Sequence, residues 1–191
     1  STAVRQVNTG SFSPVAFSTT EAERVLLFYL KESTQYNLRT MEEIWARPEI
    51  NGKVSSAMGK YPGVTALEAL AVWFYSESGY RIVNRPLRAG LPLSREQMVF
   101  ASLIYSAIAK APSVSKSVLR KSVIPENLKS LYKKGKIVRY RSFLSTAQVY
   151  VSTSGMSHLK GQTDITTFRI QPRGSAHKIE WMAEQFIESE A

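Results

Sequence analysis

The sequence predicts an α+β fold in which helices come first and strands follow. Before Pro112, capping residues followed by apolar side chains at helical spacing dominate the chain. After Pro112, the dominant pattern is short runs that alternate polar and apolar residues, as strands do. We therefore expect an extended arm over 1–17 and then a single domain. That domain would consist of a helical lobe over 18–112 and a β-rich core over 113–191.

Capping boxes predict where the helices of the lobe begin. In this pattern a Ser or Thr side chain accepts a hydrogen bond from the helix, and a Glu or Gln three positions later returns one. The pattern occurs at Ser18 or Thr20, at Thr40, at Thr65 and at Ser94. Apolar residues at helical spacing follow each position. We expect helices over 18–37, 40–47, 65–79 and 94–111.

Glycine and proline predict the breaks between these helices. Gly52, Pro62 and Gly63 indicate a loop between the second and third expected helices. A short, turn-rich helix is expected over 83–88, ahead of the long helix that Pro112 ends.

The expected β core is built from short alternating runs. These predict strands over 117–121, 136–142, 143–146, 164–171 and 177–182. Between the first two, Pro125 at a first helical position predicts a small helix as far as Tyr132, which Gly135 ends.

The composition restricts the chemistry open to the chain. It contains no cysteine, which excludes disulfides, thiolate metal ligands and a cysteine nucleophile. His158 and His177 lack the spacing of metal ligands, so no metal site is expected. No apolar run reaches about 18 residues, so no transmembrane segment is expected. The formal net charge of +10 favours contact with phosphates, although the basic run over 129–141 also fits a solvated surface.

Separated stretches of the second half carry side chains suited to one site. Arg120 lies in a short apolar run, Ser145 and Thr146 follow an apolar strand, and Glu188 and Glu190 stand near the C-terminus. Residues two apart in a strand face the same side, so both carboxylates can reach into one cleft. A second Ser-Thr-Ser run, over 152–154, competes with Ser145 and Thr146 but ranks lower, because no strand aromatic directly precedes it.

The order Arg, Ser-Thr, Glu-x-Glu resembles that of arginine-type mono-ADP-ribosyltransferases of the bacterial toxin and type III effector branch. The helical lobe adds to the resemblance, because Tyr75, Asn84, Leu87 and Arg88 match the family's pattern of an aromatic, then Asn, then Leu-Arg. The resemblance covers most of residues 65–191. It implies an ADP-ribosyltransferase-like fold, with the helical lobe packed on a β-rich catalytic core of two sheets.

The resemblance also implies a role for each site residue. Glu190 would stabilise the oxocarbenium-like centre that forms when the nicotinamide–ribose bond of NAD breaks. Glu188 would orient the incoming guanidinium. Arg120 would bind the pyrophosphate or ribose of NAD. Ser145 would hold the catalytic glutamate in place and Thr146 would pin the adjacent strands, both beside the bound NAD.

The implied function is transfer of ADP-ribose from NAD, used as a substrate, to an arginine of a host protein. The protein would be a virulence factor that a bacterium secretes and that acts in the host cytoplasm. It would be a monomer that binds no nucleic acid. Asn84 and Arg88 are expected to join the helical lobe to the core in preference to binding a ligand.

Two departures from the family pattern keep another interpretation open. Ala147 stands where the second motif usually has Ser, and Lys121 follows Arg120 where many members have Gly. The alternative is a module of the same fold that binds an arginine-containing peptide and turns over no NAD. A nucleic-acid-binding function would depend on charge alone, because no expected helix gathers its basic residues as a recognition helix does.

Overall fold

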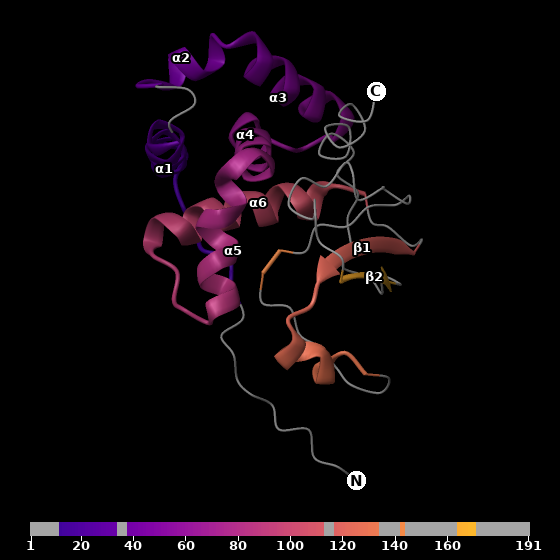
Figure 1. Cartoon of the computed structure of the whole chain (residues 1–191). Coiled ribbons are helices and arrows are strands. Elements are labelled where there is room, and N and C mark those ends of the chain that lie inside the picture. The colour runs from indigo at the N-terminus through magenta and orange to yellow at the C-terminus, as the bar shows by residue number, and fades with distance from the viewer. Residues whose placement is uncertain (1–11, 34–37, 113–116, 134–141, 144–163, 171–191) are drawn as a thin grey trace.

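A computed structural model describes residues 12–33, 38–112, 117–133, 142–143 and 164–170. Most of these residues are helical, and the strands among them form a single two-stranded antiparallel sheet. The expectation of a β-rich core of two sheets is therefore wrong. Figure 1 shows the helices labelled α1 to α6 in the upper and left part of the molecule, with the small sheet beside them.

The described helices follow one another with short connections. Their bounds are α1 Thr19–Glu32, α2 Met41–Trp45, α3 Pro48–Lys60, α4 Ala66–Phe74, the π-helix η1 Tyr75–Gly79, α5 Tyr80–Ala89 and α6 Arg95–Lys110. In the part of the chain that the structure describes, none is long and apolar enough to cross a membrane.

The capping residues act as the sequence predicts. The Ser18 side chain accepts from the backbone N–H of Glu21 and begins α1. Thr65 with Glu68, and Ser94 with Gln97, form complete capping boxes at the start of α4 and α6. Each box satisfies two backbone donors that the first turn of a helix leaves unpaired.

The loop expected around Gly52 is wrong, because α3 occupies Pro48–Lys60. Pro48 lies in the first turn, where the missing N–H costs the helix nothing. Ile50, Val54 and Ala57 form its buried face. Gly52 lies on the exposed side, so its low helix propensity is outweighed by burial of the opposite face.

The helix α4 lies at the centre of the core. Every residue from Glu68 to Phe74 is buried, because α3 and α6 both pack against this helix and α1 contacts it as well. Phe74 packs against Phe100 of α6 with ring centroids 5.7 Å apart. A helix buried on all sides is expected to be apolar all round, and α4 is so apart from Glu68 in its first turn.

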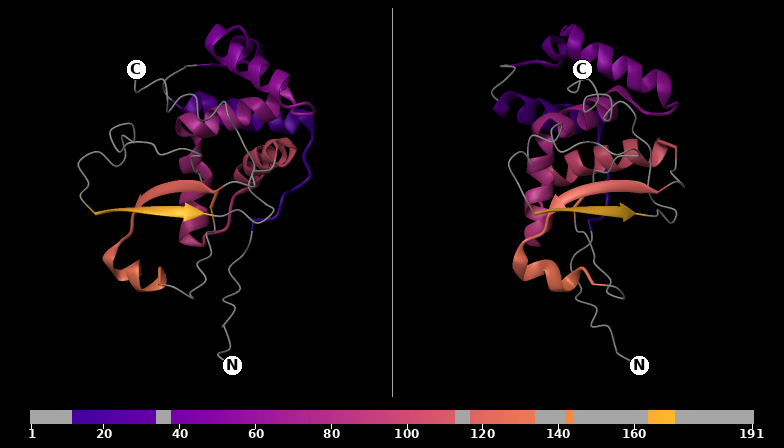
Figure 2. Two further views of the ribbon diagram at one scale, coloured as in Figure 1. Left: turned by 90° about the vertical axis from the view of Figure 1, so that its right-hand side faces the viewer. Right: turned by 45° about the vertical axis from the view of Figure 1, so that its right-hand side comes forward.

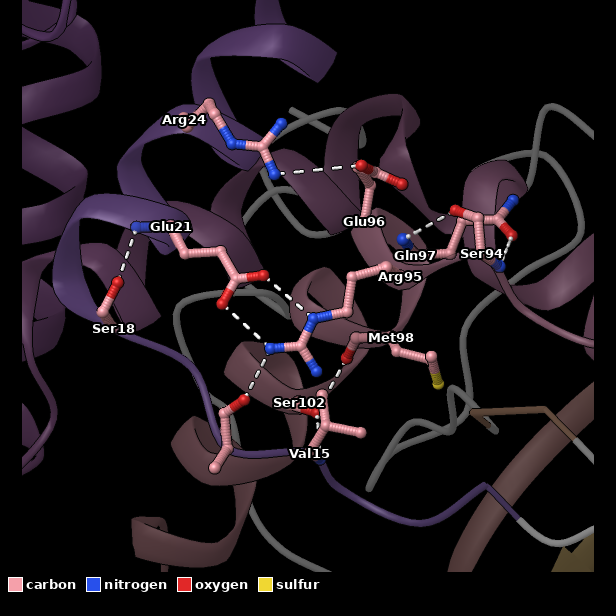
Figure 3. A network of polar contacts seen from close by, with 11 residues as sticks. Val15, Ser18, Glu21, Arg24, Ser94, Arg95, Glu96, Gln97, Met98 and Ser102 are labelled. Atoms are coloured by element: carbon pink, nitrogen blue, oxygen red, sulfur yellow. Dashed lines mark hydrogen bonds and ion pairs between the residues drawn. The ribbon is translucent and has the colours of Figure 1, made fainter.

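The N-terminal segment before α1 is held against α6, as Figure 3 shows. The N–H of Val15 donates to Ser102 Oγ at 2.9 Å, and Arg95 Nη2 donates to the carbonyl of Ala16 at 2.7 Å. The same guanidinium forms two hydrogen bonds of 2.9 Å with the carboxylate of Glu21. One arginine thus fixes the end of the N-terminal segment and the first turn of α1 to α6.

The sheet consists of β1 Val118–Val123 and β2 Ile165–Ile170, which pair with Val118 opposite Ile170 and Val123 opposite Ile165. Figure 2 shows the two strands side by side in both views. Both were predicted, as was the short helix between them, a 3₁₀-helix over Glu126–Leu131. The expected strands over 136–142, 143–146 and 177–182 lie wholly or mostly outside the described residues.

Candidate active site

A π-helical turn shapes the part of the lobe that carries the Tyr75…Asn84…Arg88 motif. The sequence predicts a helix that ends at Gly79, whereas the structure continues from α4 through η1 into α5. A Cβ at Gly79 would lie 3.0 Å from both Phe100 Cζ and Phe74 Cδ1, so glycine permits the close approach of η1 to α6. Single π-helical turns inside helices occur frequently at functional sites.

Tyr75 and Asn84 form a buried polar pair at this turn. Asn84 Nδ2 donates to the Tyr75 hydroxyl at 2.8 Å. In a regular α-helix, residues nine positions apart point to opposite sides, so helical spacing alone does not predict the pair. The wider π-helical turn between them rotates α5 relative to α4, so the two side chains come to the same side. Sequence reasoning singled out Asn84 but missed Tyr75 as its partner.

The Oδ1 atom of Asn84 is buried and accepts no hydrogen bond from the described residues. A buried acceptor left without a donor costs about 1–3 kcal/mol. Asn84 is only 4% exposed, so water does not readily satisfy this atom. Asn84 lies in α5, shortly after the π-helical turn, and a buried acceptor without a donor makes this position a candidate for function.

Two contacts join this part of the lobe to the second half of the chain. Arg88 Nε donates to Ser142 Oγ at 3.3 Å. The ring of Phe143 lies against that of Tyr75 at a centroid distance of 5.8 Å. Phe143 comes two positions before Ser145, so the structure brings the start of the second predicted motif to the Tyr75…Arg88 part of the lobe.

The N-terminal segment reaches the same place. Phe12 packs against Phe143 with ring centroids 6.1 Å apart and against Tyr105 of α6 at 6.3 Å. Phe143 is therefore held between the lobe and the segment that precedes α1. Sequence reasoning assigned Phe12 to a tail without periodicity, and no pattern along the chain predicts this long-range contact.

Proline within α5 creates a further link between helices. Pro86 has no N–H, so it cannot donate to the carbonyl of Ile82 four residues earlier. The side chain of Gln97 on α6 donates to that carbonyl instead, at 3.1 Å. This hydrogen bond from Gln97 replaces the one that Pro86 cannot make. It fixes α5, and with it Asn84 and Arg88, to α6.

An ion pair joins α4 to α6 in the same helical lobe. The Glu68 carboxylate accepts hydrogen bonds from Lys110 Nζ, from the Ser106 hydroxyl and from the N–H of Thr65. Burial raises the pKa of Glu68, but the hydrogen bonds from Lys110 and Ser106 outweigh it and leave the pKa below its ordinary value. Glu68 is thus both the capping residue of α4 and the anion of this pair.

Arg120 lies on β1, half-buried and opposite Phe168 of β2. Phe168 in turn packs against Tyr132, at a centroid distance of 5.4 Å, which ties the sheet to the chain after the 3₁₀-helix. Lys121, the next residue, is only 7% exposed. The strand therefore places Arg120 and Lys121 on opposite faces of the sheet.

The other predicted site residues, Ser145, Thr146, Glu188 and Glu190, lie outside the described residues, as does Ala147. Their convergence with Arg120 thus stays a prediction. Among the described residues, no group of three or more His, Asp or Glu side chains could hold a metal ion. No protein-family model matches this chain, and no curated protein matches it significantly.

Proposed function

We propose that this protein transfers ADP-ribose from NAD to an arginine side chain of a host protein, as an effector secreted by a bacterium. The observation that supports this proposal is the pair of contacts Arg88–Ser142 and Tyr75–Phe143. Residues 88 and 142 are 54 positions apart, yet they join the lobe motif to the segment that enters the Ser-Thr motif. Two of the motifs that resemble the transferase family are thereby neighbours in space.

The chemistry assigns each predicted residue a task. The bond between ribose C1′ and the nicotinamide nitrogen breaks, and nicotinamide leaves with the bonding electrons. Glu190 stabilises the positive charge that develops on the ribose. A nitrogen of the target guanidinium then bonds to C1′, and Glu188 orients that group and accepts its proton.

The remaining residues position NAD and the catalytic carboxylate. Arg120 binds the pyrophosphate through its planar fork of donors, which suits phosphate oxygens. Ser145 donates a hydrogen bond to Glu190 and fixes its rotamer, and Thr146 supports the neighbouring backbone. A guanidinium has a pKa above about 12 and is a poor nucleophile, so this positioning supplies much of the rate.

The direct test is a transfer assay with labelled NAD and a small arginine analogue, agmatine, as acceptor. Label should appear on agmatine with the unmodified chain, and Glu190→Gln should abolish it while the protein still folds. Glu184→Gln, which also removes a carboxylate near the C-terminus, is the matched control and should retain transfer. Equal label with Glu190→Gln and with the unmodified chain would refute the assignment.

A second candidate is a module that binds an arginine-containing peptide without consuming NAD. Lys121 favours it, because a buried lysine directly after Arg120 leaves the backbone less room near a bound dinucleotide than the glycine of many family members. Ala147 favours it too, because one hydroxyl of the second motif is missing. Saturable binding of an arginine peptide, together with no release of nicotinamide, would select this function over the transferase.

A further inference from the structure

The helix α5 presents a stripe of three arginines to solvent. Arg81, Arg85 and Arg88 are exposed, and their spacing of four and then three residues places them on one side of the helix. The buried side of α5 is formed by Val83, Asn84 and Leu87. Sequence reasoning missed this stripe because the expected helix covered only 83–88, whereas α5 begins at Tyr80 and adds Arg81 to the exposed side.

Among the described residues, these arginines form no ion pair, in contrast to the arginines that join α1 to α6. Arg81 donates to the Tyr80 hydroxyl at 3.1 Å and lies over the Tyr80 ring. Arg88 donates to Ser142. Arg95 pairs with Glu21, and Arg24 lies 3.8 Å from Glu96. Within the described part of the chain, no carboxylate oxygen lies within 4.0 Å of the α5 arginines, and α5 itself contains no acidic residue. Like charges one turn apart repel each other, so an anionic partner stabilises this stripe.

An exposed leucine follows the stripe. Leu91 is 59% exposed, the largest value among the large apolar side chains that the structure describes. Its N–H donates to the carbonyl of Pro86 at 2.9 Å, and Gly90, with φ 70°, donates to that of Leu87 at 3.1 Å. This arrangement of hydrogen bonds usually buries the residue after the glycine against the helix. Here it holds the backbone of Leu91 in place while the side chain points to water.

We propose that the α5 stripe and Leu91 together form a docking surface for an anionic lipid bilayer. Arginines attract the acidic head groups, and an adjacent apolar side chain enters the boundary between head groups and acyl chains. A nucleic acid would contact the arginines but would gain little from a protruding leucine. This proposal is independent of the transferase assignment, because none of its tests involves NAD.

The test is flotation of the full chain with vesicles of phosphatidylcholine alone, or with about 30% phosphatidylserine added. Arg81→Gln combined with Arg85→Gln removes two charges and leaves Arg88 on Ser142. Its matched control, Lys31→Gln with Arg39→Gln, removes two exposed charges outside α5. Leu91→Ser is matched by Met58→Ser, which alters another exposed apolar residue, on α3.

The proposal predicts binding to the phosphatidylserine vesicles and little binding to phosphatidylcholine alone. The Arg81/Arg85 pair should weaken binding by about fivefold for each arginine, whereas its control should weaken it much less. Leu91→Ser should weaken binding by about tenfold and Met58→Ser should leave it unchanged. Equal losses from the two charge pairs, or no effect of Leu91→Ser, would overturn the proposal. So would binding to random DNA that exceeds binding to the vesicles.

Discussion

The Nζ atom of Lys110 lies 2.6 Å from Oε1 and 2.7 Å from Oε2 of Glu68, which ties the last turn of α6 to the first turn of α4. Only 7% of the Glu68 side chain is exposed, against 35% for Lys110. The carboxylate therefore depends on its partners in the folded protein, whereas the ammonium group also contacts water. Loss of the Glu68 carboxylate should therefore cost more stability than loss of the Lys110 ammonium group.

Glu68→Gln should lower the free energy of unfolding by about 2 kcal/mol, because it leaves Lys110 and Ser106 without their anionic acceptor. Chemical denaturation at neutral pH measures the loss. Glu49→Gln, which alters the exposed pair with Arg47, is the control and should cost well under 1 kcal/mol. Equal losses in the two variants would contradict the assigned role.

Glu68 also predicts that the free energy of unfolding depends on pH in the acid range. Its pKa in the folded protein lies below the ordinary value of 4.5, so ionised Glu68 stabilises the fold above that pH. As the pH falls below 4.5, and through the lowered pKa of the folded state, this contribution is lost. Denaturation midpoints of the unmodified chain and of Glu68→Gln should converge over that range. A constant difference down to strongly acid pH would show that Glu68 titrates normally.

Gly79→Ala should destabilise the protein by about 1–3 kcal/mol, because the new methyl group would lie 3.0 Å from Phe100, Phe74 and the carbonyl of Phe74. Thermal unfolding followed by circular dichroism measures the change. Gly59→Ala in α3 is the matched control, since nothing lies within 4 Å of its added Cβ. That control should stabilise the protein by up to about 1 kcal/mol through helix propensity. The prediction fails when both substitutions act in the same direction.

Tyr75→Phe and Asn84→Leu should be coupled energetically, because each removes one partner of the same buried hydrogen bond. A double-mutant cycle should give a coupling of about 1 kcal/mol. Tyr75→Phe combined with Ser55→Ala on the exposed side of α3 should be additive. Additivity of the Tyr75–Asn84 pair as well would show that the hydrogen bond contributes nothing.

Arg95→Gln should release the segment before α1, since it removes the bonds to Glu21 and to the carbonyl of Ala16. Hydrogen exchange of the Val15 amide, which donates to Ser102, should then be faster by tenfold or more, as for a segment that opens locally. Arg24→Gln, which alters a longer contact of 3.8 Å on the same helices, should leave this amide unchanged. Unaltered protection in Arg95→Gln would mean that Ser102 alone holds the segment.

The starts of α1, α4 and α6 could be predicted from the sequence, because capping is local. Thr65 and Ser94 begin helices with the Glu or Gln that the pattern requires, and Pro112 follows the end of α6. The helix α3 was missed because its evidence is tertiary. Gly52 and Gly59 lower its helix propensity, and only the core that covers Ile50 and Val54 outweighs this.

The β-rich core was predicted wrongly because alternation over five or six residues is weak evidence for sheet structure. It identified β1 and β2 correctly, yet it says nothing about how many strands pair. In the candidate site, too, the residues could be predicted but their contacts could not. Asn84 and Arg88 could be selected by their motif, but their contacts with Tyr75 and Ser142 depend on a π-turn and on a neighbour 54 positions away.

The ring contacts of Phe12 predict how a version of this protein without its N-terminal segment would behave. A chain that begins at Ser18 would retain every described helix and strand, and its spectra would look native. It would nevertheless remove the Phe12 ring from Phe143 and from Tyr105, which is already 49% exposed. Such a truncation would unmask two neighbouring aromatic surfaces, so poor solubility in a trimmed protein would trace to the missing phenylalanine.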